Sequence, residues 1–184
     1  MKQNSTRNQL DTLVAPHLET LFRMAYQLLR NSADAQDLVQ DTCVAACANL
    51  EALAAADSPL RWLLRVQHNR FIDLHRRRGR SPLVAADEET SAKLVSDLPD
   101  PEQLLQQLQS EALLERAFLQ LEGTQRALLT LRAEGHELAE IEEITGIGRE
   151  ALGARLRRAR LRLAQLLADM NRETAMVRHI GSRK

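Results

Sequence analysis

Residues 59–80, PLRWLLRVQHNRFIDLHRRRGR, combine a helical pattern of apolar residues with a dense set of arginines. At 3.6 residues per turn the apolar residues fall on one face, as in a helix that packs against a core. They are Leu60, Leu63, Leu64, Phe71 and Leu74. The opposite face carries Trp62, Asn69, Asp73 and Arg76. The stretch therefore predicts an amphipathic helix with an aromatic residue on its polar side.

The polar face of this helix has two interpretations. Seven arginines against the single Asp73 give the stretch a charge of +6. A water-exposed tryptophan is unfavourable unless a partner covers it, and a stacked base beside phosphate-binding arginines would do so. This favours a surface that follows phosphates and stacks an unpaired base. A solvated basic helix, with Trp62 covered by a neighbouring loop, explains the same residues equally well.

The zero net charge of the chain conceals blocks of opposite sign. Residues 31–58 carry five acidic residues and no Lys or Arg, and residues 85–122 carry nine acidic residues against two basic ones. Residues 149–162 carry six arginines against one glutamate. With 59–80, the order along the chain is acidic, basic, acidic, basic. Such blocks suit a chain that contacts a polyanion at two separate places.

The composition of the 184 residues favours an all-α protein made of two small helical domains. Only five residues are aromatic, and seven glycines and five prolines interrupt a chain rich in Leu and Ala. The sequence has no run of about 18 apolar residues and no hydrophobic N-terminal signal region, so we expect a cytoplasmic protein without membrane insertion. Cys43 and Cys47 are one helical turn apart and lack a nearby His pair, so we expect neither a metal nor another cofactor.

Helical periodicity predicts a first helix over 9–30 and a second over about 34–53. The second helix has an expected buried stripe of Val39, Cys43, Ala46, Leu50 and Leu53. Another of its faces carries Asp34, Asp37, Gln40 and Asp41. Interaction with the helix N-terminus explains the first two aspartates but not Asp41, which lies two turns in. An acidic stripe of this kind is equally suited to docking a basic protein surface.

The second half of the chain predicts a helix-turn-helix. Residues 81–101 are acidic, contain prolines and lack a helical stripe, so we expect them to form a flexible linker. Helices are then expected from 102 to 122, from a cap at Thr124 to Gly135, from 137 to 145, and from 148 to about 170. Gly146 is the expected left-handed stop between the last two, which form the helix-turn-helix pattern.

The last predicted helix has a buried side and an adjacent side suited to DNA. The expected buried residues are Leu152, Leu156, Ala159, Leu163 and Leu166. The candidate DNA-binding residues are Arg149, Ala151, Ala154, Arg155 and Arg158. Small residues and arginines near a helix N-terminus allow close approach to base edges and phosphates. A structural three-helix bundle would show the same pattern.

Together the two halves resemble the extracytoplasmic-function (ECF, group 4) sigma factors of the sigma-70 family, two-domain subunits of bacterial RNA polymerase. DAQDLVQ at 34–40 matches the family's DAxDLxQ motif, and WLLRVQHNRFIDLHR at 62–76 follows its WL…N…D..R pattern. The resemblance covers about residues 9–168. It implies a region 2-like domain at 9–80, an acidic linker at 81–101, a region 4-like domain at 102–170 and a basic tail at 171–184.

The resemblance implies a transcription initiation factor that binds core RNA polymerase, reads the −35 element and melts the −10 element of promoter DNA. The resemblance assigns docking on the polymerase β′ clamp to Asp34, Asp37, Gln40 and Asp41. It assigns binding of the −10 element to the loop at about 51–60 and to Arg61, Trp62, Arg65, Asn69, Asp73, Arg76 and Arg77. It assigns binding of the −35 element to Arg149, Ala151, Ala154, Arg155 and Arg158 of the last helix. The domain that contains this helix would also contact the β flap. Control by an anti-sigma factor is a further expectation.

The last helix departs from the family pattern. The alanine of the family's EIA is Glu142 here, and usual lysine and hydroxyl positions are Gly153 and Ala154. These changes predict weaker phosphate anchoring. Nothing in the sequence resembles a catalytic constellation, so we expect no enzyme. Two alternatives stay open: a sigma-like regulator or decoy that binds polymerase or an anti-sigma factor without initiating, and an ordinary helix-turn-helix regulator.

Overall fold

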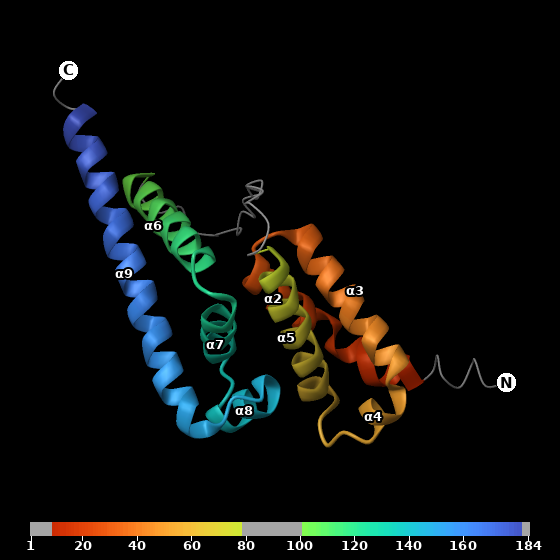
Figure 1. The fold of residues 1–184 in the computed structure, drawn as a ribbon. Coiled ribbons are helices and arrows are strands. Elements are labelled where there is room, and N and C mark those ends of the chain that lie inside the picture. Colours follow the sequence, from red (N-terminus) through yellow and green to blue (C-terminus); the bar gives the residue numbers. More distant parts are fainter. Residues whose placement is uncertain (1–8, 79–100, 182–184) are drawn as a thin grey trace.

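The computed structural model describes residues 9–78 and 101–181, with side chains described at 9–78 and 109–172. Within these ranges every regular element is a helix (Figure 1). The expectation of an all-α protein is therefore confirmed. The predicted linker lies outside the described residues except for Pro101, at which a helix already begins.

The predicted first helix is divided at Pro16. Residues 9–14 are helical, a 3₁₀ turn spans Ala15–His17, and α2 spans Leu18–Leu29. Proline has no backbone N–H to donate, so it interrupts the helical hydrogen-bond series here. α2 ends at Arg30 in the left-handed conformation, with φ of 53°. The neighbouring Asn31 then caps the next helix by accepting a hydrogen bond from the Asp34 backbone N–H at 2.9 Å.

The predicted second helix is two helices, α3 over Ser32–Ala48 and α4 over Leu50–Ala54. The break falls at Asn49, whose side-chain amide donates to the Ala45 carbonyl oxygen at 2.8 Å. Such side-chain bonds compete with the helical hydrogen bonds of the backbone. The buried residues of α3 are Ala35, Leu38, Thr42, Ala45 and Ala46. The expected stripe is confirmed at Ala46 and Leu53, whereas Val39, Cys43 and Leu50 are half-buried and pack against the core.

α5 spans Pro59–Arg78 and lies on the side of the first half that faces α7 and α8 (Figure 1). Its buried residues are Leu63, Leu64, Gln67 and Phe71. The apolar stripe is confirmed at three of five positions, since Leu60 and Leu74 are half-buried. Gln67 was not expected in the core. It is tolerated there because its side-chain amide donates to the Leu21 carbonyl oxygen of α2 at 2.9 Å.

The second half contains α6 over Pro101–Leu119, α7 over Gly123–Ala133, α8 over Leu138–Thr145 and α9 over Arg149–Gly181. α7 is capped by Glu122 and Gln125 in a reciprocal capping box, so the expected cap at Thr124 was wrong. The left-handed stop at Gly146 is confirmed, with φ of 69°. α9 continues past the expected end near Met170 and packs along α6 (Figure 1).

The two halves pack directly on each other. α5 lies against α7 and α8, and α2 lies against α7 (Figure 1). The largest core cluster joins residues of both halves, for example Leu21 and Leu63 from the first and Leu131 and Ile141 from the second. Burying these side chains together places α8 of the helix-turn-helix beside the arginine-rich helix.

Candidate polymerase and nucleic-acid interfaces

An acidic face lies on α3. Asp37, Gln40 and Asp41 are exposed, and Val44 beside them is 61% exposed. Their spacing of three or four residues places them on one side of the helix. The face therefore offers carboxylates, an amide and an apolar group to a partner. The structure thus brings three of the four candidate polymerase-binding residues together.

Asp34, the fourth, is in a different situation. It is half-buried, and both of its carboxylate oxygens accept hydrogen bonds from the Arg78 guanidinium at 2.8 Å. This bidentate pair raises the pKa of Arg78. Asp34 therefore ties the start of α3 to the end of α5.

The polar face of α5 is divided into an exposed part and a covered part. The exposed residues of the candidate −10 set are Arg65, Asn69, Asp73, Arg76 and Arg77. Trp62 is half-buried and packs against the larger core cluster. Arg61, also half-buried, places its Nε atom 3.0 Å from Glu143 Oε2 and its Nη1 atom 4.0 Å from Glu140 Oε1 of α8. The start of the face is thus covered by α8.

Glu140 is held by more than Arg61. Its carboxylate accepts a hydrogen bond from the Glu137 backbone N–H at 3.0 Å, which is the main cause of its lowered pKa. His136 and Arg61 lower this pKa further. A negative charge therefore stays fixed beside the start of α5.

The recognition helix α9 presents its candidate side to solvent. All five candidate −35 residues, Arg149, Ala151, Ala154, Arg155 and Arg158, are exposed. The expected buried side is confirmed at Leu152, Leu156, Ala159 and Leu166, whereas Leu163 is half-buried. Glu142, the residue that departs from the family pattern, accepts a hydrogen bond from the Arg149 backbone N–H at 3.1 Å. It therefore caps the helix that would approach DNA.

Besides Gln67, the sequence analysis missed the buried Arg126 and the half-buried His68 and His75. Arg126 is 6% exposed and donates to the carbonyl oxygens of Leu28 at 3.0 Å, Leu121 at 3.2 Å and Leu119. Burial lowers the pKa of Arg126 to about 10. Burial also lowers the pKa of His68 and of His75. Nothing in their sequence neighbourhood marks these residues, because each is buried by a remote helix.

The cysteines show no sign of a special role. Both thiols are free, and burial of Cys43 together with the nearby Cys47 raises the pKa of Cys43. A raised pKa makes the reactive thiolate scarcer. Within the described ranges no group of three or more His, Cys, Asp or Glu side chains is placed to hold a metal ion. In the same ranges no helix is long and apolar enough to cross a membrane.

Comparison with known proteins identifies related chains. The family model for sigma-70 region 2 matches residues 13–81. The chain is 33% identical over 162 residues to the RNA polymerase sigma factor CnrH of Cupriavidus metallidurans, and the match covers 84% of each chain. It is 32% identical over 166 residues to the ECF RNA polymerase sigma factor SigE of Mycolicibacterium smegmatis. That match covers 90% of this chain but only 64% of the relative's length.

A solved structure shows the same fold. It contains the sigma factor RpoE of Bartonella quintana in complex with the anti-sigma factor NepR, with a TM-score of 0.62 and 26% sequence identity. The similarity covers 84% of this chain and 94% of that chain. Two packed helical halves, the second carrying a helix-turn-helix, thus define a protein of the sigma-70 type. The chain belongs to the ECF RNA polymerase sigma factors, which act in transcription initiation and are not enzymes.

Proposed function

We propose that this sigma factor binds the β′ clamp and β flap of core RNA polymerase and directs initiation at promoters with distinct −35 and −10 elements. The observation that carries the proposal is the presence of two exposed basic faces, on α5 and on α9, separate from the acidic face of α3. The basic faces suit a polyanion at two places, and the acidic face suits a basic protein surface. On this proposal residues 9–80 act as region 2, 81–101 as the linker, 102–170 as region 4 and 171–184 as a basic tail.

The residue roles follow the three faces. The acidic face, Asp37, Gln40 and Asp41, docks on polymerase, and Asp34 supports it through Arg78. The exposed half of α5 and the loop at about 51–60 hold the melted −10 strand. α9 enters the −35 major groove, where the Glu142 cap leaves one fewer backbone N–H for phosphate. Because RpoE of Bartonella quintana was solved with an anti-sigma factor, we also propose control by an anti-sigma factor.

The test is run-off transcription with purified protein and core polymerase on a promoter library. Transcripts that depend on the protein and share −35 and −10 sequences are the expected result. Polymerase binding without transcripts from any promoter would contradict initiation and favour a decoy that holds polymerase. Sequencing of the transcripts would also identify the promoters.

Neutralising the acidic face is expected to weaken polymerase binding. The double variant Asp37→Asn/Asp41→Asn keeps side-chain shape but removes two exposed charges, and we expect core polymerase to bind about tenfold more weakly, which corresponds to about 1.4 kcal/mol. The measurement is fluorescence anisotropy of labelled protein titrated with core polymerase. The control Asp11→Asn/Glu19→Gln removes the same charge from other exposed positions and should bind like the wild type. Equal affinity of the two double variants would refute the docking role.

Removing the α9 arginines is expected to change the salt dependence of DNA binding. Arg155→Ala/Arg158→Ala deletes two candidate phosphate contacts, so the slope of log affinity against log salt should become shallower by about 2 for a mixed-sequence 20-bp duplex. The control Arg172→Ala lies on the same helix, farther from its N-terminus. A slope that is unchanged in the double variant would place the DNA-binding surface elsewhere.

A further inference from the structure

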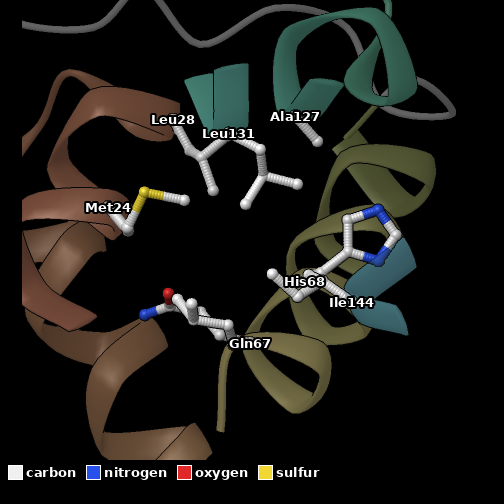
Figure 2. Close-up of a pocket in the computed structure, with 8 residues that line it drawn as sticks. Met24, Leu28, Gln67, His68, Ala127, Leu131 and Ile144 are labelled. Atoms are coloured by element: carbon white, nitrogen blue, oxygen red, sulfur yellow. The ribbon is translucent and has the colours of Figure 1, made fainter. Parts of the chain in front are cut away.

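The cavity between the halves is small and lined mainly by apolar side chains, such as Met24 and Ile144 (Figure 2). Of its polar groups, the Gln67 amide already donates to the Leu21 carbonyl oxygen at 2.9 Å, which leaves the His68 ring. A ligand site needs several polar groups that converge on the ligand, and this cavity does not supply them. Exposed side chains that have no partner inside the chain are the stronger indication of a further site.

The helix-turn-helix is rich in glutamates, and four of the five at residues 137–150 have partners within the chain. Their carboxylates accept hydrogen bonds from backbone N–H groups, pair with arginine, or do both. The four are Glu137, Glu140, Glu142 and Glu143. The Glu150 carboxylate, in the first turn of α9, is exposed and forms neither a hydrogen bond nor an ion pair with the residues whose side chains the structure describes. Interaction with the helix N-terminus is the one role that it has inside this part of the chain.

Gly153 leaves a gap beside Glu150. Positions three, four and seven residues apart share one side of a helix, and on α9 this side consists of Glu150, Gly153, Ala154 and Arg157. Inside a helix a glycine costs up to about 1 kcal/mol relative to alanine. Neither the backbone nor the packing requires glycine at 153, because its φ is not positive and an added Cβ would meet nothing within 4 Å. Close approach of a molecule outside the chain would account for the missing side chain.

The bases differ in what their major-groove edges offer to a carboxylate. An ionised carboxylate accepts hydrogen bonds and has none to donate. Cytosine presents an amino group as a donor, whereas guanine and thymine present acceptor oxygens that repel the carboxylate. Adenine presents its amino group beside the acceptor N7, so it is the less suitable of the two amino bases. An exposed carboxylate at the start of a helix in the major groove therefore favours cytosine.

The charge around Glu150 is compatible with a surface that lies against DNA. Three arginines on the same stretch of α9, Arg155, Arg157 and Arg158, are exposed. Their guanidinium groups supply the positive charge that neutralises phosphates. A single carboxylate among them therefore does not prevent the helix from approaching the groove.

We propose that Glu150 is a specificity-determining residue of α9, which accepts a hydrogen bond from the amino group of a cytosine in the −35 major groove. This inference rests on the proposed role of α9 in reading the −35 element. Gly153 and Ala154 let the helix lie close to the base edges, so that the glutamate side chain reaches the cytosine. Arg157, about 10 Å farther along the helix at about 1.5 Å per residue, donates to a phosphate at the edge of the same groove.

The first experiment measures base preference with the full chain and core polymerase. The promoter that gives the strongest run-off transcript is made with each of the four bases at each −35 position. The wild type should prefer cytosine over guanine and thymine at one position by about fivefold or more. Glu150→Ala should lose the preference at that position and keep the preferences at the others.

Two further variants separate base reading from a general effect of charge. Glu150→Gln should move the preference from cytosine toward adenine, because an amide accepts from the adenine amino group and donates to N7 at the same time. Asp169→Asn removes the same charge from an exposed position of α9 farther from its start, and it should keep the wild-type preference.

The second experiment fills the gap at Gly153. Gly153→Leu should lower transcription from every form of the promoter by about tenfold, an effect like that of a mismatched base pair, because the leucine side chain would stand between α9 and the base edges. Leucine favours a helix more than glycine does, and an added Cβ meets nothing within 4 Å. Thermal unfolding followed by circular dichroism should therefore occur at the same or a higher temperature than in the wild type.

Three results would overturn the proposal. Unchanged base preferences in Glu150→Ala would leave the carboxylate a role at the helix N-terminus alone. Equally stronger transcription by Glu150→Ala from all promoter forms would show that the carboxylate merely repels phosphates. Transcription by Gly153→Leu at the wild-type level would place DNA away from this side of α9. A wild type whose transcription does not depend on the −35 bases would instead contradict the proposed function of α9, and this inference with it.

Discussion

Replacing Arg126 with alanine is expected to lower the free energy of unfolding by about 3–5 kcal/mol. Arg126 is buried where α2, α6 and α7 meet, and its guanidinium donates hydrogen bonds to three backbone carbonyl oxygens. Two of these oxygens, on Leu28 and Leu119, lie in the last turns of α2 and α6. Carbonyl oxygens in the last turn of a helix have no backbone donor within their own helix. Alanine would leave all three oxygens buried without donors and would also open a cavity.

Urea denaturation followed by circular dichroism measures this effect. Arg126→Lys is the informative companion, because it keeps the charge but cannot direct donors at three separate oxygens, so an intermediate loss is expected. Arg70→Ala, at an exposed position of α5, serves as the control and should leave stability unchanged. A loss below about 1 kcal/mol for Arg126→Ala would show that water replaces the guanidinium.

Replacing Phe71 with alanine is expected to cost about 3–5 kcal/mol, the usual range for deleting a buried aromatic ring. Phe71 is 1% exposed and packs in a cluster with Leu28 of α2, Leu38 of α3 and Ala127 of α7. Its ring also lies against His75, with the centroids 6.0 Å apart. The side chain thus contributes to the packing of the first half and to its contact with the second.

The same denaturation measurement tests Phe71→Ala. Phe71→Leu retains much of the buried volume, and the loss should be clearly smaller. Leu161→Ala removes a side chain that is 54% exposed and should change stability by less than about 0.5 kcal/mol. If Phe71→Ala and Leu161→Ala unfolded at the same urea concentration, Phe71 would not belong to the core.

Much of the fold and of the candidate surfaces could be predicted because helical periodicity is a local property. The α5 stripe through Leu63, Leu64 and Phe71, the α9 stripe through Leu152 and Leu156, and the stop at Gly146 all follow from spacing and backbone preference. The family motifs also identified the correct family, which the 33% identity to CnrH supports independently.

Helix boundaries and the rotation of α3 were less predictable. Asn49 ends α3 through its own side chain, and Glu122 takes the capping role that Thr124 was expected to have. Thr42 is buried because its hydroxyl donates to the Leu38 carbonyl oxygen at 2.8 Å. A threonine satisfied within its own helix can replace an apolar residue in the core, which hydrophobic periodicity does not detect.

The sequence by itself determined the helices, the acidic and basic faces and the family of this protein. Only the tertiary structure decided that Trp62 and Arg61 lie beneath α8, that Asp34 pairs with Arg78, and that Arg126 joins the two halves. The physical reason is distance along the chain. Residues three or four apart fix the pattern of a helix, but Arg126 and its acceptor Leu28 are 98 positions apart, and their meeting depends on the packing of α7 against α2.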